Sequence, residues 1–202
     1  MKTEKAAICA QAFRLLLAFT VVCGGLYTLL LTGILQAAFP QQANGSLFLS
    51  REGKAYGSAC IGQPASGAGH LWGRVMGPAT DIYRTIDGEK LFYSGPSNLS
   101  PASPAYKKLL AQRVAEIRAA HPEMGDTPVP VDLVTNSGSG LDPQISPAAA
   151  SYQVRRLARN TGRSEEEVQS ILDRCTEQRF LGIFGEPRVN VLKVNLILDG
   201  IL

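Results

Sequence analysis

Hydrophobic residues are distributed unevenly along this chain of 202 residues. The stretch 15–35 contains no charged residue, whereas polar and charged positions recur throughout the remainder. As a helix with about 1.5 Å of rise per residue, this stretch would be about 31 Å long, which matches the core of a bilayer. A single segment cannot close a barrel, so a spanning helix is the structure that satisfies its backbone in lipid. The pattern predicts one transmembrane helix over residues 15–38.

A cleaved signal peptide is the competing interpretation. Its apolar region would be shorter, about 7 to 15 residues, and would end at a small-x-small site. Residues 36–40 fit such a site poorly, so we interpret the segment as an uncleaved anchor. Gly24, Gly25 and Thr28 give it a small-residue face at which a helix of another subunit could approach closely, although small residues occur in any spanning helix.

Charges on the two flanks of the anchor predict its orientation. Lys2, Lys5 and Arg14 precede the apolar stretch, and no Lys or Arg follows it before Arg51. Positive flanks tend to remain on the cytoplasmic side. We therefore expect residues 1–14 in the cytoplasm and the domain 39–202 outside, anchored in the plasma membrane by a single pass.

The pattern after the anchor mixes strands, loops and helices, which predicts an α+β (mixed) soluble domain on a single N-terminal transmembrane helix. Two short strands are expected at 46–50 and 54–61 around a turn. The glycine-rich stretch 62–77 is expected to be a surface loop, and 78–104 to be irregular. A further strand is expected at 129–135.

Apolar residues at helical spacing predict three helices, over residues 105–120, 147–160 and 165–172. Ser146 can cap the second helix, and Gly162 can end it. Ser164 and Glu167 have the spacing of a capping box for the third. The C-terminal stretch 189–202 is ambiguous between strand and helix, and the capping potential of Asn190 favours a short helix.

Composition narrows the functions open to the domain. A formal net charge of +3, without a block of Lys or Arg, argues against nucleic-acid binding. Of four cysteines, only Cys60 and Cys175 lie outside the anchor region. They could pair in an oxidising compartment or remain free thiols, and both alternatives stay open. No spacing of cysteine or histidine resembles a metal site.

Candidate catalytic chemistry is sparse. The only histidines are His70, in the glycine-rich stretch, and His121, at a predicted helix end. Neither belongs to a zinc motif, and no G-x-S-x-G nucleophile motif occurs. Ser137-Gly138-Ser139-Gly140 follows the predicted strand and leads to a capped helix start, where free amides attract anions. It lacks the lysine of a P-loop, so on residues alone a structural turn is favoured over a nucleotide site.

One long string resembles a known family. Residues 131–150, followed by Tyr152-Gln153-Val154, closely resemble the signature of the C chain of the bacterial potassium-transporting Kdp ATPase. Three further segments agree with that family, namely residues 71–74, 96–101 and 185–192. With the single anchor included, the resemblance covers nearly the whole chain.

The resemblance implies an accessory subunit of an ATP-driven potassium uptake complex, which stabilises that complex. A channel-like A chain would carry the ion and a P-type B chain would hydrolyse ATP. By family description the C chain acts as a catalytic chaperone that raises the ATP affinity of the ATPase subunit. Carried onto this sequence, the resemblance implies ATP as the ligand, no metal, no catalytic residue, and these binding residues: Ser137, Gly138, Ser139, Gly140 and Gln153.

Two departures and one conflict qualify this expectation. Val75-Met76 and Gln144 differ from residues that many members carry at these positions. The predicted orientation also places the domain outside, whereas ATP is cytoplasmic. The alternative is an extracytoplasmic assembly or ion-entry subunit that docks on the channel-like chain without contacting ATP. Any effect on ATP affinity would then be a coupling free energy transmitted through the complex.

Overall fold

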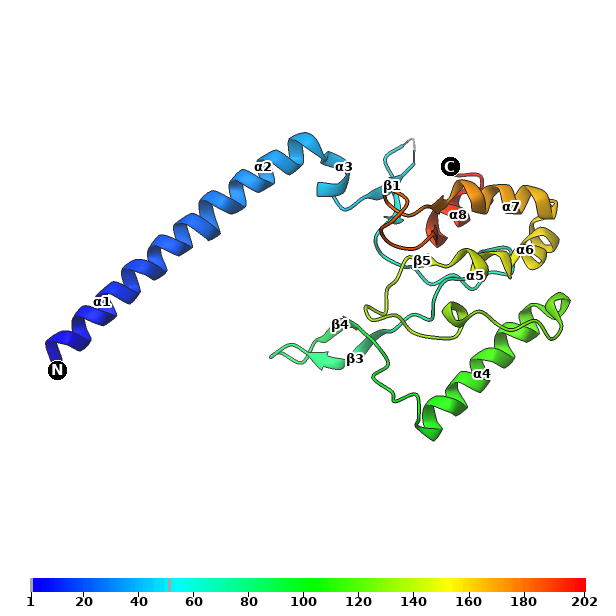
Figure 1. Cartoon of the computed structure of the whole chain (residues 1–202), viewed down its shortest axis with the longest axis horizontal. Coiled ribbons are helices and arrows are strands. Elements are labelled where there is room, and N and C mark those ends of the chain that lie inside the picture. The colour runs from blue at the N-terminus through cyan, green and yellow to red at the C-terminus, as the bar shows by residue number, and fades with distance from the viewer. Residues whose placement is uncertain (1, 51) are drawn as a thin grey trace. The chain divides into compact units, whose positions relative to one another are not determined.

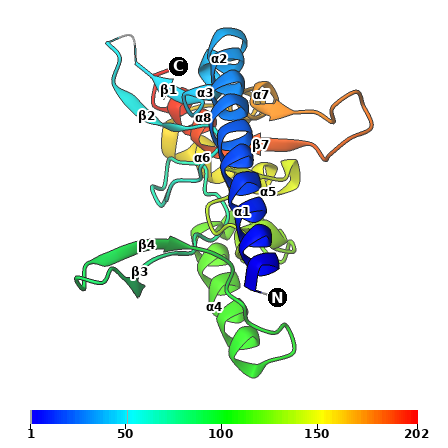
Figure 2. The same ribbon diagram turned by 90° about the vertical axis from the view of Figure 1, so that its left-hand side faces the viewer.

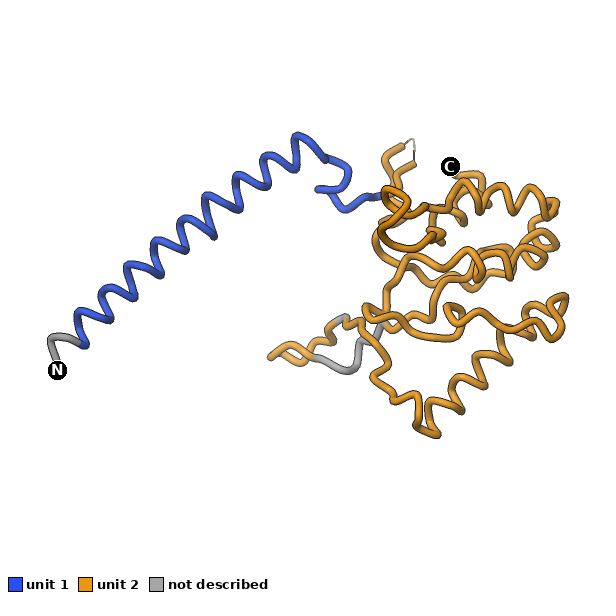
Figure 3. The backbone as a smooth tube through the Cα atoms, in the orientation of Figure 1, with its two compact units in different colours: residues 1–47 blue, residues 48–202 orange. Residues whose placement is uncertain are grey.

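The computed structural model describes residues 2–50 and 52–202, and the chain divides into two compact units, 1–47 and 48–202 (Figure 1 and Figure 3). The first unit is almost entirely helical, and the second combines helices with short strands. The predicted fold class is therefore confirmed: mixed helix and strand in a domain that follows one long apolar N-terminal helix.

The N-terminal helix consists of three consecutive parts, α1 (Lys2–Phe19), the π-helical η1 (Thr20–Tyr27) and α2 (Thr28–Ala38). Its span Lys5–Ala38 is long and apolar enough to cross a membrane, with a mean hydropathy of 2.1 in its most apolar window. The π-helical part was not expected from the sequence. There the Thr28 hydroxyl donates to the carbonyl of Cys23, five residues back, at 3.0 Å. A short helix, α3 (Pro40–Ala43), follows.

The strands form three small sheets. β1 (Leu47–Leu49) pairs with β2 (Ala55–Ser58), which confirms the two strands expected at the start of the domain. β3 (Pro78–Arg84) and β4 (Lys90–Ser94) form an antiparallel hairpin. The third sheet has the order β5-β7-β6 and is antiparallel throughout; its strands are β5 (Gln144–Ile145), β6 (Thr176–Glu177) and β7 (Arg188–Asn190).

Two expectations about strands were wrong. Residues 78–104 are not irregular, because the β3–β4 hairpin forms there around a turn in which Gly88 adopts a φ of +84°. An Asp-Gly pair between strand-forming residues is a hairpin signal, and it lies in this turn. Residues 129–135 do not form a strand. They contain the 3-10 turn η3 (Val131–Leu133), because a short apolar run fits a buried turn as well as a strand.

The predicted helices are present, with one division. α4 (Pro104–Ala120) is confirmed, and η2 (Pro122–Met124) follows it. The second helix separates into α5 (Pro147–Ser151) and α6 (Val154–Thr161), and Gly162 ends it with a φ of +70°. α7 (Glu165–Arg174) begins with the complete capping box. Asn190 ends β7 and caps α8 (Val191–Leu198), so both readings of the C-terminal pattern describe real structure.

The core of the second unit lies among these helices, where α7 packs against α5, α6 and α8. Its apolar members come mainly from the helices, from β5 and β7 and from the segment before β3, and include Leu71, Ile117, Leu133, Ile145, Leu157, Val168, Leu172, Val189 and Val194. Leu71 is completely buried. The glycine-rich stretch 62–77 is therefore not a surface loop throughout, because Leu71 lies in the core and Trp72 packs against it.

Candidate functional site

The segment that carries the family resemblance is a loop, residues 136–143, which we call the serine–glycine loop. Three distant segments hold its backbone. The amide of Gly77 donates to the carbonyl of Gly140 at 2.9 Å, and the amide of Gly62 donates to the carbonyl of Leu141 at 2.7 Å. The hydroxyl of Ser94, from β4, donates to the carbonyl of Ser139 at 2.6 Å. The loop is thus fastened on several sides.

The serine hydroxyls of this loop already accept hydrogen bonds from its own amides. The Gly140 amide donates to Ser137 Oγ at 2.9 Å, and the Leu141 amide donates to Ser139 Oγ at 3.1 Å. Gly140 has a φ of +69°, and a Cβ there would lie 2.7 Å from the carbonyl oxygen of Gly95. Gly138, by contrast, is exposed and has open space where a Cβ would be. Only the outer edge of the loop is free to meet a ligand.

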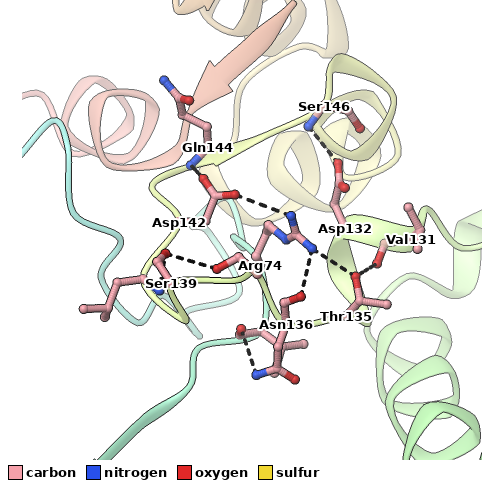
Figure 4. A network of polar contacts seen from close by, with 12 residues as sticks. Arg74, Val131, Asp132, Thr135, Asn136, Ser139, Asp142, Gln144 and Ser146 are labelled. Atoms are coloured by element: carbon pink, nitrogen blue, oxygen red, sulfur yellow. Dashed lines mark hydrogen bonds and ion pairs between the residues drawn. The ribbon is translucent and has the colours of Figure 1, made fainter. Parts of the chain in front are cut away.

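Arg74 is the centre of the polar network beside this loop (Figure 4). One terminal nitrogen, Nη2, donates to the carbonyl of Asn136 at 3.0 Å and to Thr135 Oγ1 at 3.2 Å. The other, Nη1, lies 3.5 Å from Asp142 Oδ2. Arg74 Nε is buried and has no partner among the described residues. Arg74 lies in the segment 71–74 of the resemblance, but the sequence indicated no role for it.

The helix start after the loop offers fewer free amides than the sequence suggested. Pro147 has no N–H, and Ser146 Oγ accepts from the Ala149 amide at 3.2 Å. Asp132 Oδ2 accepts from the Ser146 amide at 2.8 Å, as Figure 4 shows. The carboxylate of Asp132 therefore already lies at this helix start. That arrangement disfavours a second anion at the same place.

A depression of about 290 Å³ adjoins this network. Its charged lining residues are Arg74, Asp132, Asp142, Glu186 and Arg188. Three carboxylates face two guanidinium groups, so the depression carries no excess of positive charge for a phosphate.

Gln153 lies at the start of α6 with no exposed surface. Its Oε1 accepts from the Trp72 amide at 2.8 Å and from Arg156 Nη2 at 2.7 Å. Its Nε2 donates to the carbonyls of Trp72 at 2.9 Å and Ala149 at 3.1 Å. Every polar atom of this amide is used within the domain. Among the described residues no hydrogen bond joins Gln153 to residues 137–140; the link between them runs through the segment 72–74.

Arg156 also belongs to this buried group, although the sequence indicated no role for it. Its side chain is 1% exposed and lies over the Trp72 ring at 4.4 Å. It donates to the carbonyls of Ala68 at 2.5 Å and His70 at 2.9 Å. Burial lowers the pKa of Arg156 to about 10. The sequence signal for its burial was its position three residues after Gln153 on a helix with an apolar face.

His121 is the remaining member of the buried group. Its Nδ1 lies 2.7 Å from the Ile117 carbonyl, so this nitrogen carries the proton. Nε2 then accepts from Arg156 Nε at 2.8 Å. Burial lowers the pKa of His121, the bond to Ile117 opposes that shift, and the Arg156 charge adds to it. His121 is therefore a structural acceptor within the core.

The two family departures contact this region through their backbones. The Val75 carbonyl accepts from Asn136 Nδ2 at 3.4 Å, and the Gln144 amide donates to Asp142 Oδ1 at 3.0 Å. Other side chains at these positions would keep both bonds. The departures therefore leave the local backbone arrangement intact.

The remaining candidate residues are the two cysteines of the domain and His70. Cys60 is exposed and Cys175 is buried, and both are free thiols. His70 Nε2 lies 2.9 Å from Asp199 Oδ1 beside a depression of about 430 Å³. Within residues 2–50 and 52–202, no three metal-ligating side chains gather in one place.

The small residues of the apolar helix lie in and beside η1. Gly24 and Gly25 belong to η1, and a Cβ at either would meet nothing within 4 Å. Thr28 opens α2, and its hydroxyl is already bonded to the Cys23 carbonyl. This face therefore offers close backbone approach and no free hydroxyl at Thr28.

Comparison with known proteins assigns these features to a family. Residues 9–200 match the family model described as K+-transporting ATPase, c chain. A potassium-transporting ATPase KdpC subunit from Clostridium botulinum (strain Eklund 17B / Type B) is 50% identical over 199 residues, 98% of each chain. One from Clostridium perfringens is 50% identical over 92% of this chain and 93% of the relative. One from Sorangium cellulosum is 51% identical over 94% of this chain and 95% of the relative. The chain belongs to the family of the C chain of the K+-transporting ATPase.

Proposed function

We propose that this chain is an accessory subunit of a potassium-transporting ATPase complex and contributes neither the pore nor the hydrolytic site. Its family membership supports the complex, since the relatives are named as KdpC subunits of that ATPase. The single observation that supports an accessory role is the internal use of the polar groups of the resemblance. Gln153 is fully buried and fully bonded, and the serine hydroxyls accept from their own loop.

The N-terminal helix serves, in this proposal, as a single-pass anchor with the domain outside the cell membrane. Its apolar span supports insertion, and the basic residues before the span support a cytoplasmic N-terminus. The face of Gly24, Gly25 and Thr28 packs against a helix of the channel-like A chain. An effect on ATP affinity in the B chain would reach it as a coupling free energy through the complex.

Co-purification of the tagged chain with the A and B chains tests this proposal. We expect Gly24→Leu and Gly25→Leu to weaken recovery of the A chain, because leucine side chains prevent close helix approach. Gly33→Leu is the matched control, since Gly33 also has no neighbour within 4 Å and lies beyond η1 on α2. Equal recovery with all three variants would contradict the proposed helix contact, and no recovery of either partner with the unaltered chain would contradict subunit membership.

Direct ATP contact is the second candidate function, with the catalytic chaperone role that the resemblance implies. The exposed edge of the serine–glycine loop at Gly138 and Ser139 favours it. A photoreactive ATP analogue tests it on the full chain. If ATP binds there, Ser139→Ala reduces labelling, whereas Ser170→Ala, an exposed serine on α7, leaves it unchanged. Labelling that is equal in both variants would argue against this site.

A further inference from the structure

Four large hydrophobic side chains gather at the tip of the connection between β6 and β7. Phe180, Leu181, Ile183 and Phe184 are 71%, 73%, 72% and 63% exposed. We call these four residues the apolar tip. Figure 2 shows the connection projecting from the rest of its unit. Single exposed hydrophobic residues are ordinary, but a cluster at the end of a projecting hairpin marks a contact surface.

Four backbone amides at the apolar tip are already hydrogen-bonded within the connection. The Phe180 amide donates to the Phe184 carbonyl at 2.8 Å, and the Phe184 amide donates back at 2.9 Å. The amides of Gly182 and Ile183 donate to carbonyls of residues 179 and 180 at 3.1 and 3.2 Å. Leaving water is costly for unpaired amides, and these four are already paired.

The backbone of the apolar tip contains a residue in an unfavourable conformation. Leu181 has a φ of +53°, which is unfavourable for a residue with a bulky side chain. The glycines at 182 and 185 take the other left-handed positions of the turn, with φ of +73° and +80°. A strained leucine that is also 73% exposed gains little packing within the domain to offset that strain.

The charges of the hairpin lie behind the tip and cancel in pairs. Arg179 and Glu186 are 2.5 Å apart, and Arg188 and Glu177 are 2.8 Å apart. The stem is therefore neutral, and nothing in it selects an anionic surface. The apolar side chains lie at the end of the hairpin and the charged side chains lie in its stem. This order matches that of a bilayer, in which polar headgroups border the hydrocarbon core.

We propose that the apolar tip inserts into the outer part of the lipid bilayer in which the chain is anchored, as a second, shallow membrane contact. The proposal rests on the proposed anchor. Only residues 39–47 separate the spanning helix from the domain, and fully extended they reach at most roughly 30 Å. The tether holds the domain close to lipid, so a weak insertion is favoured by a high effective concentration.

Depth-dependent fluorescence on the full chain in nanodiscs of zwitterionic phosphatidylcholine tests this insertion. Phe184→Trp adds one tryptophan at the tip, and the emission of Trp72 in the unaltered chain is subtracted. We expect the added emission to be blue-shifted, quenched by bromine on the lipid acyl chains and insensitive to salt. Adding Leu181→Asp and Ile183→Asp should abolish the quenching, because charged tips do not enter hydrocarbon.

Ile86→Trp is the matched control, since Ile86 is 106% exposed in the turn of the other projecting hairpin, β3–β4. Its emission should remain red and unquenched. If Phe184→Trp behaves like Ile86→Trp, the proposal is wrong. If the tip becomes protected only when the A and B chains are added, it docks on protein and the lipid proposal is also wrong. A chain that does not co-purify with nanodiscs would overturn the anchor, and the insertion with it.

Discussion

The buried side chains of Gln153 and Arg156 join α6 to the segment 67–72. Both are polar, and within residues 2–50 and 52–202 neither has a carboxylate among its hydrogen-bond partners. Their partners are backbone amides and carbonyls, Trp72 and His121. Because the acceptors of Arg156 are neutral, no opposite charge offsets the cost of removing its guanidinium from water. The positions of these acceptors must therefore be maintained closely.

We expect Gln153→Ala to lower the free energy of unfolding by about 2–4 kcal/mol, because it leaves the Trp72 amide and carbonyl unpaired in the core. Urea unfolding of the full chain in detergent, without nucleotide, measures this. Arg155→Ala is the control: Arg155 is exposed on the same helix, and its loss should cost less than about 0.5 kcal/mol. A small effect at both positions would contradict a structural role for Gln153.

His121 makes the stability of the domain depend on pH. Because burial holds its folded-state pKa below the ordinary value of about 6.5, the unfolded chain takes up the proton first as the pH falls. Stability is therefore complete above pH 6.5 and is lost as the pH drops from there toward the lowered pKa. Melting temperatures between pH 7.5 and 5.5 should fall for the unaltered chain and less steeply for His121→Gln. Equal slopes for the unaltered chain and His121→Gln would contradict this role of His121.

At the scale of elements, the conformation of the serine–glycine loop depends on the segments packed against it as much as on its own residues. We expect Gly140→Ala to destabilise the domain by about 1–3 kcal/mol, because its φ is positive and a Cβ would meet the Gly95 carbonyl. Gly138→Ala should be nearly neutral in the same thermal unfolding assay, since its site is open. Equal losses would mean that the loop is not fastened as described.

Helix ends were well predicted at this scale, and turns and strands less well. Ser146, Ser164 and Asn190 each accept the amide three residues on, as their sequence contexts indicate. Caps are local, so a pattern of four residues suffices. The β3–β4 hairpin and η3 were missed because short apolar runs leave strand, turn and loop nearly equivalent until the rest of the fold is present.

At the scale of the whole molecule, the question is on which side of the membrane the domain lies. In intact cells, we expect a membrane-impermeant maleimide to modify Cys60, which is exposed. Cys175 should not react, because it is buried and its burial raises the pKa of its thiol. Mass spectrometry of the tagged chain measures this, with Cys60→Ser as the control. Modification of Cys60 only after cell lysis would place the domain in the cytoplasm and make direct ATP contact accessible.

The sequence by itself determined the apolar helix, the helix caps, the mixed fold class and the family, because each rests on residues close together in the chain or on a long contiguous string. The tertiary structure alone decided that Gln153 is a buried clamp, that Arg74 centres a network, and that the apolar tip is exposed. The physical reason is separation: Gln153 and Trp72 are 81 residues apart in the chain, and only folding brings their polar atoms to 2.8 Å. The role of a side chain here depends on partners that its own neighbourhood does not contain.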